Sequence, residues 1–382
     1  ERLGSRLILR RGDALTVLSD LIRETRAGRV VWSRLYDTRS IAPDKAIKKA
    51  LGQDGIEAVS VNGSLLFEPW TVETGQGGFY KVYSPFWRAV RGRDVGDVLP
   101  RPGNLAPPDT WPGSDSLDDW ELGRAMDRGA GVVGPHARVG EAAARDRLGE
   151  FIDGKIATYK ERRNFLAEEA TSGLSENLAY GEISPRQIWH AGWRVMETGP
   201  SAQAEHFLKE LVWREFAYHL LFHTPHIATR NWREEWDGFP WAGDNEAAGR
   251  WRRGMTGVEV VDAAMRQLYV TGTMHNRARM VVASFLTKHL LTDWRIGEAW
   301  FRDCLIDWDP ASNAMGWQWT AGSGPDAAPY FRIFNPESQA EKFDPDGAYR
   351  NRYLAEGRTD PHADALAFFD AVPRSWGLSP GQ

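Results

Sequence analysis

The hydrophobic pattern of this 382-residue chain changes once, near Gly140, and that change limits the folds it can adopt. Before this point short apolar runs alternate with helix-like stretches; the runs lie at 7–9, 30–32 and 58–61, the stretches at 13–27 and 43–51. Strands that alternate with helices favour a parallel α/β sheet. Beyond it the apolar residues recur with helical spacing, which favours an all-helical second part.

The second part contains four candidate helices, at 184–198, 201–222, 257–270 and 275–291. Ser184, which precedes a proline, and Ser201 supply N-cap chemistry for the first two. Between the two parts, residues 100–137 are rich in Pro, Gly, Asp and Trp without periodicity, which predicts a long linker.

Composition sets further limits. With 382 residues the chain is long enough for two domains, and no run of about 18 apolar residues could span a bilayer. The single cysteine, Cys304, forms no intramolecular disulfide and matches no metal-ligand spacing, which favours a reducing compartment. We therefore expect a cytoplasmic protein without a metal site, and a monomer. A net charge of −5 means that any nucleic-acid contact depends on a local basic patch.

Segment 303–336 combines paired acids, three tryptophans and an ordered Gly/Pro loop. Each tryptophan taken singly is more often core packing than chemistry. The whole string, which includes Asp307-Trp-Asp309 and Trp317-Gln-Trp319, resembles the flavin-binding signature of the DNA photolyase/cryptochrome family. The resemblance covers nearly the whole chain and is dense over 147–344.

The resemblance implies an architecture and an activity. It predicts a partial, Rossmann-like parallel sheet domain over 1–105, an interdomain linker over 106–137 and a helical FAD-binding domain over 138–382. Relatives begin with a further strand, helix and strand, so we expect that the chain lacks its beginning. The implied activity is that of a bacterial class I photolyase, in which light-excited reduced FAD repairs cyclobutane pyrimidine dimers in UV-damaged DNA.

The resemblance also assigns the FAD site. Small hydroxyl residues at a helix start can present free N–H groups to a phosphate, although the same string is also an ordinary N-cap. An acid beside Arg279 would by itself indicate a salt bridge, whereas the family places both against the flavin, with Asn313 facing its reactive nitrogen. Trp308 stands where relatives carry Gly or Ala. The implied FAD residues are Tyr159, Thr171, Ser172, Gly173, Leu174, Ser175, Phe207, Arg279, Asp307, Trp308, Asp309 and Asn313.

A second set matches the pocket that holds the flipped dimer. Glu210 and Trp213 lie at i, i+3, and Asn276 and Met280 at i, i+4, so each pair shares a helix face. Without the resemblance, a surface Glu above a core Trp is the simpler interpretation. Trp319 completes the set. Photolyases specific for (6-4) lesions carry a histidine in place of Asn276, which argues against that substrate.

Three tryptophans and three arginines complete the predicted residues. Trp241, Trp294 and Trp317 match the family's electron-transfer triad, with Trp251 as an alternative branch; among 18 tryptophans, three matches are only supporting observations. Arg163, Arg214 and Arg277 are the cations expected to face DNA, although helix-surface arginines are often merely solvated.

Several alternatives stay open. Residues 36–44 lack the Asn-Glu pair of the folate-binding type, so folate, a deazaflavin or no antenna chromophore all remain. Thr273 stands where relatives commonly have Trp. A cryptochrome-like photoreceptor without repair activity is the chief rival function, and a repair enzyme restricted to single strands is a third.

Overall fold

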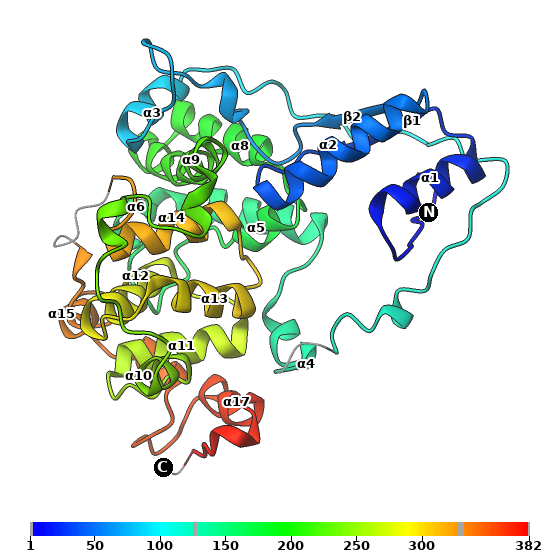
Figure 1. The fold of residues 1–382 in the computed structure, drawn as a ribbon. Helices are drawn as coiled ribbons and strands as arrows, with labels where there is room; N and C mark the ends of the chain where they lie inside the picture. The colour runs from blue at the N-terminus through cyan, green and yellow to red at the C-terminus, as the bar shows by residue number, and fades with distance from the viewer. Residues whose placement is uncertain (1–2, 125–127, 327–331, 381–382) are drawn as a thin grey trace.

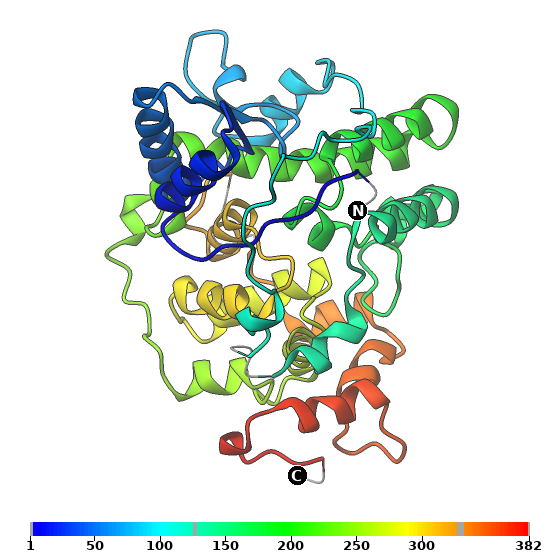
Figure 2. The same cartoon turned by 90° about the vertical axis from the view of Figure 1, so that its right-hand side faces the viewer.

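The computed structural model describes residues 3–124, 128–326 and 332–380. A stack of helices forms the body at the left of Figure 1, and the first strands and helices project from its upper right. From there a long linker returns along the far right to α4 (Ala130–Val133), as the turned view in Figure 2 also shows. The family's architecture, a small parallel sheet followed by a helical part, is confirmed.

The sheet consists of two parallel strands among the described residues, β1 (Arg29–Ser33) and β2 (Glu57–Val61). Helix α2 (Thr38–Gln53) connects them, and α1 (Ala14–Thr25) precedes β1. Asp13 caps α1 by accepting from Thr16 N at 3.0 Å, and Arg26 ends it in a left-handed conformation. The helix and strand types expected for 13–61 are therefore confirmed.

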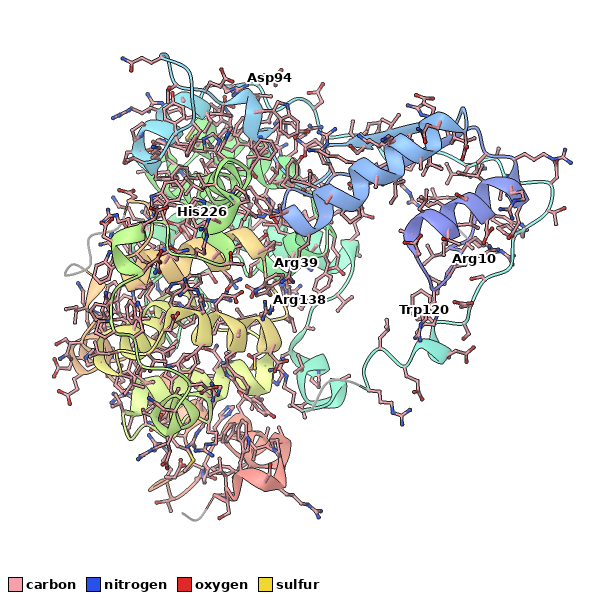
Figure 3. The ribbon with its side chains drawn as sticks, in the orientation of Figure 1. Arg10, Arg39, Asp94, Trp120, Arg138 and His226 are labelled. Atoms are coloured by element: carbon pink, nitrogen blue, oxygen red, sulfur yellow. The ribbon has the colours of Figure 1, made fainter. Side chains whose placement is uncertain are left out.

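The strand predicted at 7–9 is not formed. Leu9 N instead donates to Ser114 Oγ at 2.9 Å, and Leu9 O accepts from Asp115 N at 2.8 Å. This segment thus lies against the irregular linker. The linker contains prolines, which have no backbone N–H, so it cannot supply the regular hydrogen bonds of a β-ladder. Figure 3 labels Arg10 and Trp120, which lie on these two segments, at the outer edge of the molecule.

Predicted helices of the second part are present, with one correction. α8 (Pro185–Thr198) carries a full capping box made by Ser184. α9 (Ser201–His223) begins without a side-chain cap, because Pro200 occupies the N-cap position, so the cap predicted at Ser201 is wrong. The last two are α11 (Glu259–Thr271) and α12 (Asn276–Ser284), and α12 continues as a π-helical turn over Phe285–His289.

The remaining α-helices are α3 (Tyr83–Val90), α5 (Glu141–Glu150), α6 (Tyr159–Arg162), α7 (Ser175–Ala179), α10 (Glu246–Arg252), α13 (Trp294–Cys304), α14 (Pro310–Ala321), α15 (Pro336–Phe343), α16 (Ala348–Tyr353) and α17 (Ala363–Ala371). No helix of the described chain is long and apolar enough to cross a membrane.

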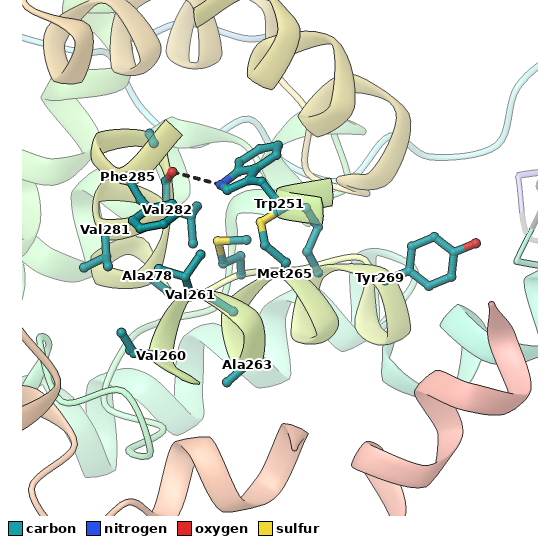
Figure 4. Packing of buried hydrophobic residues seen from close by; sticks show 14 of the residues in the cluster. Trp251, Val260, Val261, Ala263, Met265, Tyr269, Ala278, Val281, Val282 and Phe285 are labelled. Atoms are coloured by element: carbon teal, nitrogen blue, oxygen red, sulfur yellow. Dashed lines mark hydrogen bonds between the residues drawn. The ribbon is translucent and has the colours of Figure 1, made fainter. Parts of the chain in front are cut away.

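Two apolar cores hold the helices together. One is built on α10 to α14 and the C-terminal helices; in it the fully buried Trp251 donates its indole N–H to Val282 O at 3.0 Å (Figure 4). The other packs α8 and α9 against α3 and the chain over 66–95. The buried Glu215 of α9 ties these parts together by accepting from Leu66 N at 2.7 Å and Phe67 N at 3.2 Å.

Candidate functional site

A cavity of about 680 Å³ takes its lining from both cores. Helices α9, α12 and α14 and the loop before α7 surround it. This volume lies within the range of pockets that hold cofactors and other small ligands, roughly 300–1,000 Å³.

Most of the residues predicted from the sequence line this cavity. They are Tyr159, Arg163, Ser172, Leu174, Ser175, Phe207, Glu210, Trp213, Arg214, Asn276, Arg277, Arg279, Met280, Asp307, Asp309, Asn313, Trp317 and Trp319. Thr171, Gly173, Trp241, Trp294 and Trp308 do not belong to its lining.

Asp307 and Arg279 form the charged centre of the cavity wall. Arg279 Nη2 donates to Asp307 Oδ2 at 2.8 Å, and Arg279 Nε donates to Met274 O at 2.8 Å, so the guanidinium is fixed at two points. Asp307 Oδ1 is buried and has no hydrogen-bond partner among the described residues. A buried carboxylate oxygen without a donor is costly, and a ligand that donates a hydrogen bond would satisfy it.

Asp309 caps α14 from the other side of Trp308. Its Oδ1 accepts from Ser312 N at 2.7 Å and its Oδ2 from the Tyr218 hydroxyl at 2.6 Å. Burial, followed by the charge of Asp309, raises the pKa of Tyr218, which therefore stays a donor. Asn313, one turn further along α14, donates its amide to Asp309 O at 3.1 Å and is buried at the cavity wall.

Trp308 points away from the cavity, contrary to the cofactor-binding role that the sequence suggested. Its indole N–H donates to Glu298 Oε1 at 3.3 Å, and its ring packs against the α10–α14 core. Asp307 and Asp309 lie on either side of it in sequence and face the cavity, so the intervening residue is turned outward.

The phosphate turn expected at 171–175 reaches the cavity only in part. Ser172, Leu174 and Ser175 line it. Gly173 instead has φ +61°, and its carbonyl accepts from Arg147 Nη1 at 2.5 Å. A glycine tolerates this backbone conformation without strain, and Gly173 thus shapes the turn from behind.

All five residues predicted for the dimer line this cavity. Glu210 forms an ion pair with Arg163, and the Asn276 amide lies 3.9 Å from Met280 Sδ. The indole of Trp213 stacks on Tyr83 with ring centroids 3.6 Å apart. Tyr83 belongs to α3, so the N-terminal part of the chain supports the Trp213 ring.

The tryptophans of the predicted electron path lie in a connected region. Trp317 lines the cavity, and Trp251 is its aromatic neighbour, with ring centroids 6.1 Å apart. Trp294 is fully buried and donates to Asn231 Oδ1 at 2.9 Å. Backbone bonds from Ala242 N to Leu291 O and from Asp293 N to Ala242 O place Trp241 beside the start of α13, where Trp294 lies.

Arg214 requires a correction. Its Nη1 donates to Ser64 O at 2.7 Å and lies 3.4 Å from Glu215, and its guanidinium covers the Tyr218 ring. It therefore braces α9 against the N-terminal chain, which does not suit a DNA-facing cation. Arg277, by contrast, donates to Asn164 Oδ1 at 2.8 Å at the cavity, where burial and the charge of Arg163 lower its pKa.

Some lining residues were not predicted. They include Asn164, Leu178, His206, Leu211, Ser312 and Met315. His206 precedes Glu210 by four residues on α9, so helical spacing from Glu210 could have found it. Its ring is half-buried and lies 3.1 Å from Arg163 Nη1.

Comparisons with known proteins identify the two parts of the chain. Residues 207–375 match the family described as the FAD binding domain of DNA photolyase, and residues 1–103 match the DNA photolyase family. A deoxyribodipyrimidine photo-lyase of Agrobacterium fabrum is 51% identical over 357 residues, which cover 93% of this chain and 74% of that protein.

Solved structures agree. The crystal structure of a class III photolyase from Agrobacterium tumefaciens superposes with a TM-score of 0.90 at 48% identity, covering 99% of this chain and 79% of that one. A Synechocystis cryptochrome superposes with a TM-score of 0.82 at 28% identity, covering 99% and 80%. The sequence and the fold together lead to one conclusion: this chain belongs to the DNA photolyase/cryptochrome family and carries its FAD-binding domain.

Proposed function

We propose that this protein is a deoxyribodipyrimidine photo-lyase, which uses light to split cyclobutane pyrimidine dimers in DNA. One observation carries the proposal: Glu210, Trp213, Asn276 and Met280 line the same cavity as the Asp307–Arg279 pair. A lining that is both polar and aromatic suits a flipped-out pyrimidine dimer, and relatives up to 51% identical bear the same enzyme name.

The residues present fit FAD. The unpartnered Asp307 Oδ1 can accept a hydrogen bond from the flavin ring, and Arg279 orients that carboxylate by donating to its other oxygen. Ser172 and Ser175 are the residues we assign to the phosphate end, and Asn313 is the uncharged amide beside the ring. Bound FAD supplies, when reduced and excited by light, the electron that opens the cyclobutane ring.

A second group of lining residues binds the dimer in this proposal. Glu210 and Asn276 hydrogen-bond the pyrimidine edges, Trp213 and Trp319 pack against the rings, and Met280 lines the floor. Flipping a base out costs a few kcal/mol in base-flipping enzymes generally, photolyases among them. Stacking on an aromatic ring contributes about 1–3 kcal/mol per base, enough to offset that cost.

We propose further that photoreduction of FAD passes through Trp317. From there the structure favours two neighbours, since Trp251 is in ring contact with Trp317 and Trp294 begins the adjoining helix. Trp241 is the expected outer end. We keep the domain limits 1–105, 106–137 and 138–382, a cytoplasmic location and a monomeric state as proposals from the sequence.

The subclass also belongs to the proposal. The sequence suggested class I, whereas the likeness to a class III photolyase at 48% identity supports class III for this chain. The identity of an antenna chromophore and the preference for single or double strands are independent of this choice.

Photorepair is tested with FAD-loaded, photoreduced protein. We expect a thymine-dimer oligonucleotide to lose its dimer under blue light and to keep it in the dark, as separated by chromatography. Glu210→Ala combined with Trp213→Ala should abolish repair, whereas Glu205→Ala, on α9 outside the cavity, should preserve it.

An unrepaired dimer in the light, with FAD bound and reduced, would reject the repair proposal. It would instead favour a photoreceptor, the second candidate, which the likeness to a Synechocystis cryptochrome supports. Repair of single-stranded but not duplex oligonucleotide would restrict the substrate.

A further inference from the structure

The lining of the cavity contains a histidine whose role the proposed function does not yet include. His206 lies one turn before Glu210 on α9, and both side chains are one-third exposed. The imidazole Nε2 is 3.1 Å from Arg163 Nη1 and 3.9 Å from Glu210 Oε1. Arg163, His206 and Glu210 thus form a triangle of side chains in the lining of the cavity.

The chemistry of the triangle fixes the state of the histidine. A guanidinium only donates hydrogen bonds, so Nε2 of His206 must accept, and the ring proton must lie on Nδ1. A protonated imidazole has no acceptor nitrogen; it would be repelled by Arg163 and attracted by Glu210. Protonation of His206 would therefore break its contact with Arg163 and draw Glu210 towards His206.

Charges from each packed element act on this ring. Burial is the largest cause that lowers the pKa of His206, Arg163 follows, and Glu210 opposes both. The other charged or titratable groups that face it are Tyr159, Lys160 and Glu161 from α6 and Lys209 from α9. The neutral ring is therefore the resting state near neutral pH.

We propose that His206 is a positioning residue, which holds Arg163 against Glu210 and so presents the Glu210 side chain to the dimer in a fixed orientation. This inference rests on the proposed dimer site at Glu210. Arg163 is also held by Tyr159, whose ring its guanidinium covers at 5.2 Å, and the Arg163 side chain is only 11% exposed. His206 is the neutral acceptor that completes this arrangement without adding a competing charge.

The first test needs no substrate. Nitrogen NMR of histidine-labelled, FAD-loaded protein should show His206 as the Nδ1–H tautomer with an accepting Nε2. Arg163→Met should raise the pKa of His206, because it removes a neighbouring positive charge. An Nε2–H tautomer, or a pKa that does not respond to Arg163→Met, overturns the proposal whether or not the protein repairs DNA.

The second test measures dimer binding in the dark. At about pH 7.5, His206→Leu should weaken the preference for a dimer oligonucleotide over the undamaged one by about tenfold, as expected for loss of a hydrogen bond to a charged group. His206→Gln, whose amide oxygen accepts but does not titrate, should restore that preference. Between about pH 7.5 and 5 the wild type should lose preference, and His206→Gln should not.

His190 offers a matched control, because it is a half-buried histidine on α8 that contacts Gly96 O outside the cavity. His190→Gln should keep the acidic loss of preference. Wild-type behaviour of His206→Leu at both pH values, or an acidic loss retained in His206→Gln, would refute the positioning role. A wild type that shows the expected tautomer without any dimer preference would reject the proposed substrate instead.

Discussion

The position of the Trp317 ring depends on a single glycine of the neighbouring helix. A Cβ added at Gly297 of α13 would collide with the Trp317 ring and lie 2.6 Å from Leu286 Cδ2. The ring is 2% exposed and packs at 4.9 Å from Phe301, so it has little room to move. Overpacking of this kind costs about 1–3 kcal/mol.

We therefore expect Gly297→Ala to lower the free energy of unfolding by about 1–3 kcal/mol in urea titrations. Gly149→Ala in α5 is the control, since a Cβ there meets nothing within 4 Å; it should leave stability unchanged or raise it by up to about 1 kcal/mol. Equal stability of Gly297→Ala and wild type would mean that Trp317 is not held as the structure describes.

At the scale of single residues, the sequence predicted which residues belong to the site better than it predicted where their side chains point. Asp307, Arg279 and Asn313 were expected at one site and line one cavity. The orientations of Trp308 and Arg214 were not foreseeable, because they depend on Glu298 and on Ser64, which is 150 residues from Arg214 in sequence. A motif lists neighbours along the chain, whereas the partner that turns a side chain inward or outward is set by packing.

Among the helices, α9 has two roles: it supplies residues to the cavity and it binds the N-terminal part of the chain. It supplies His206, Glu210 and Trp213 to the cavity, and on its other side it binds the N-terminal chain through Glu215. Burial is the main cause that raises the pKa of Glu215 to about 7, against the ordinary 4.5. Between these values the folded protein keeps a proton that the unfolded chain has lost, so stability falls as the pH rises.

The pH dependence gives a prediction for the contact of Glu215 with Leu66 and Phe67. From about pH 4.5 to 7 the shift corresponds to a loss of about 3 kcal/mol in the free energy of unfolding. Glu215→Gln keeps an acceptor for Leu66 N and Phe67 N but does not titrate, so we expect it to gain that amount relative to wild type between pH 5 and about 8. Urea titrations at the two pH values measure the free energy of unfolding. An equal change in that free energy for both proteins would contradict the raised pKa of Glu215.

Helices were predictable as elements because their apolar spacing and caps are local. The periodic run at 201–222 corresponds to α9, and Ser184 caps α8 as expected. The apolar run at 7–9 failed as a strand because a strand needs a partner, and the chain beside it is the irregular linker. The stacking of Trp213 on Tyr83 across two elements had no local signal.

On the scale of the molecule, a net charge of −5 must coexist with binding to a polyanion. Attraction to DNA then depends on the few cations that line the cavity rather than on the overall field. Arg277 is the candidate that combines a place in the lining with no carboxylate among its hydrogen-bond partners in the described structure. Arg214 instead contacts Ser64, Glu215 and Tyr218, where α9 meets the N-terminal chain.

These two arginines therefore differ in how their loss should change the salt dependence of DNA binding. Each phosphate contact contributes about 0.9 to the slope of log affinity against log salt concentration on duplex DNA. We expect Arg277→Gln to reduce the slope by about that amount and Arg214→Gln to leave it unchanged, as measured by fluorescence anisotropy with a dimer duplex. A partly unfolded Arg214 variant would shift the intercept and keep the slope, so the comparison survives a loss of stability. A slope that falls with Arg214→Gln and not with Arg277→Gln would place the DNA where α9 meets the N-terminal chain rather than beside Arg277.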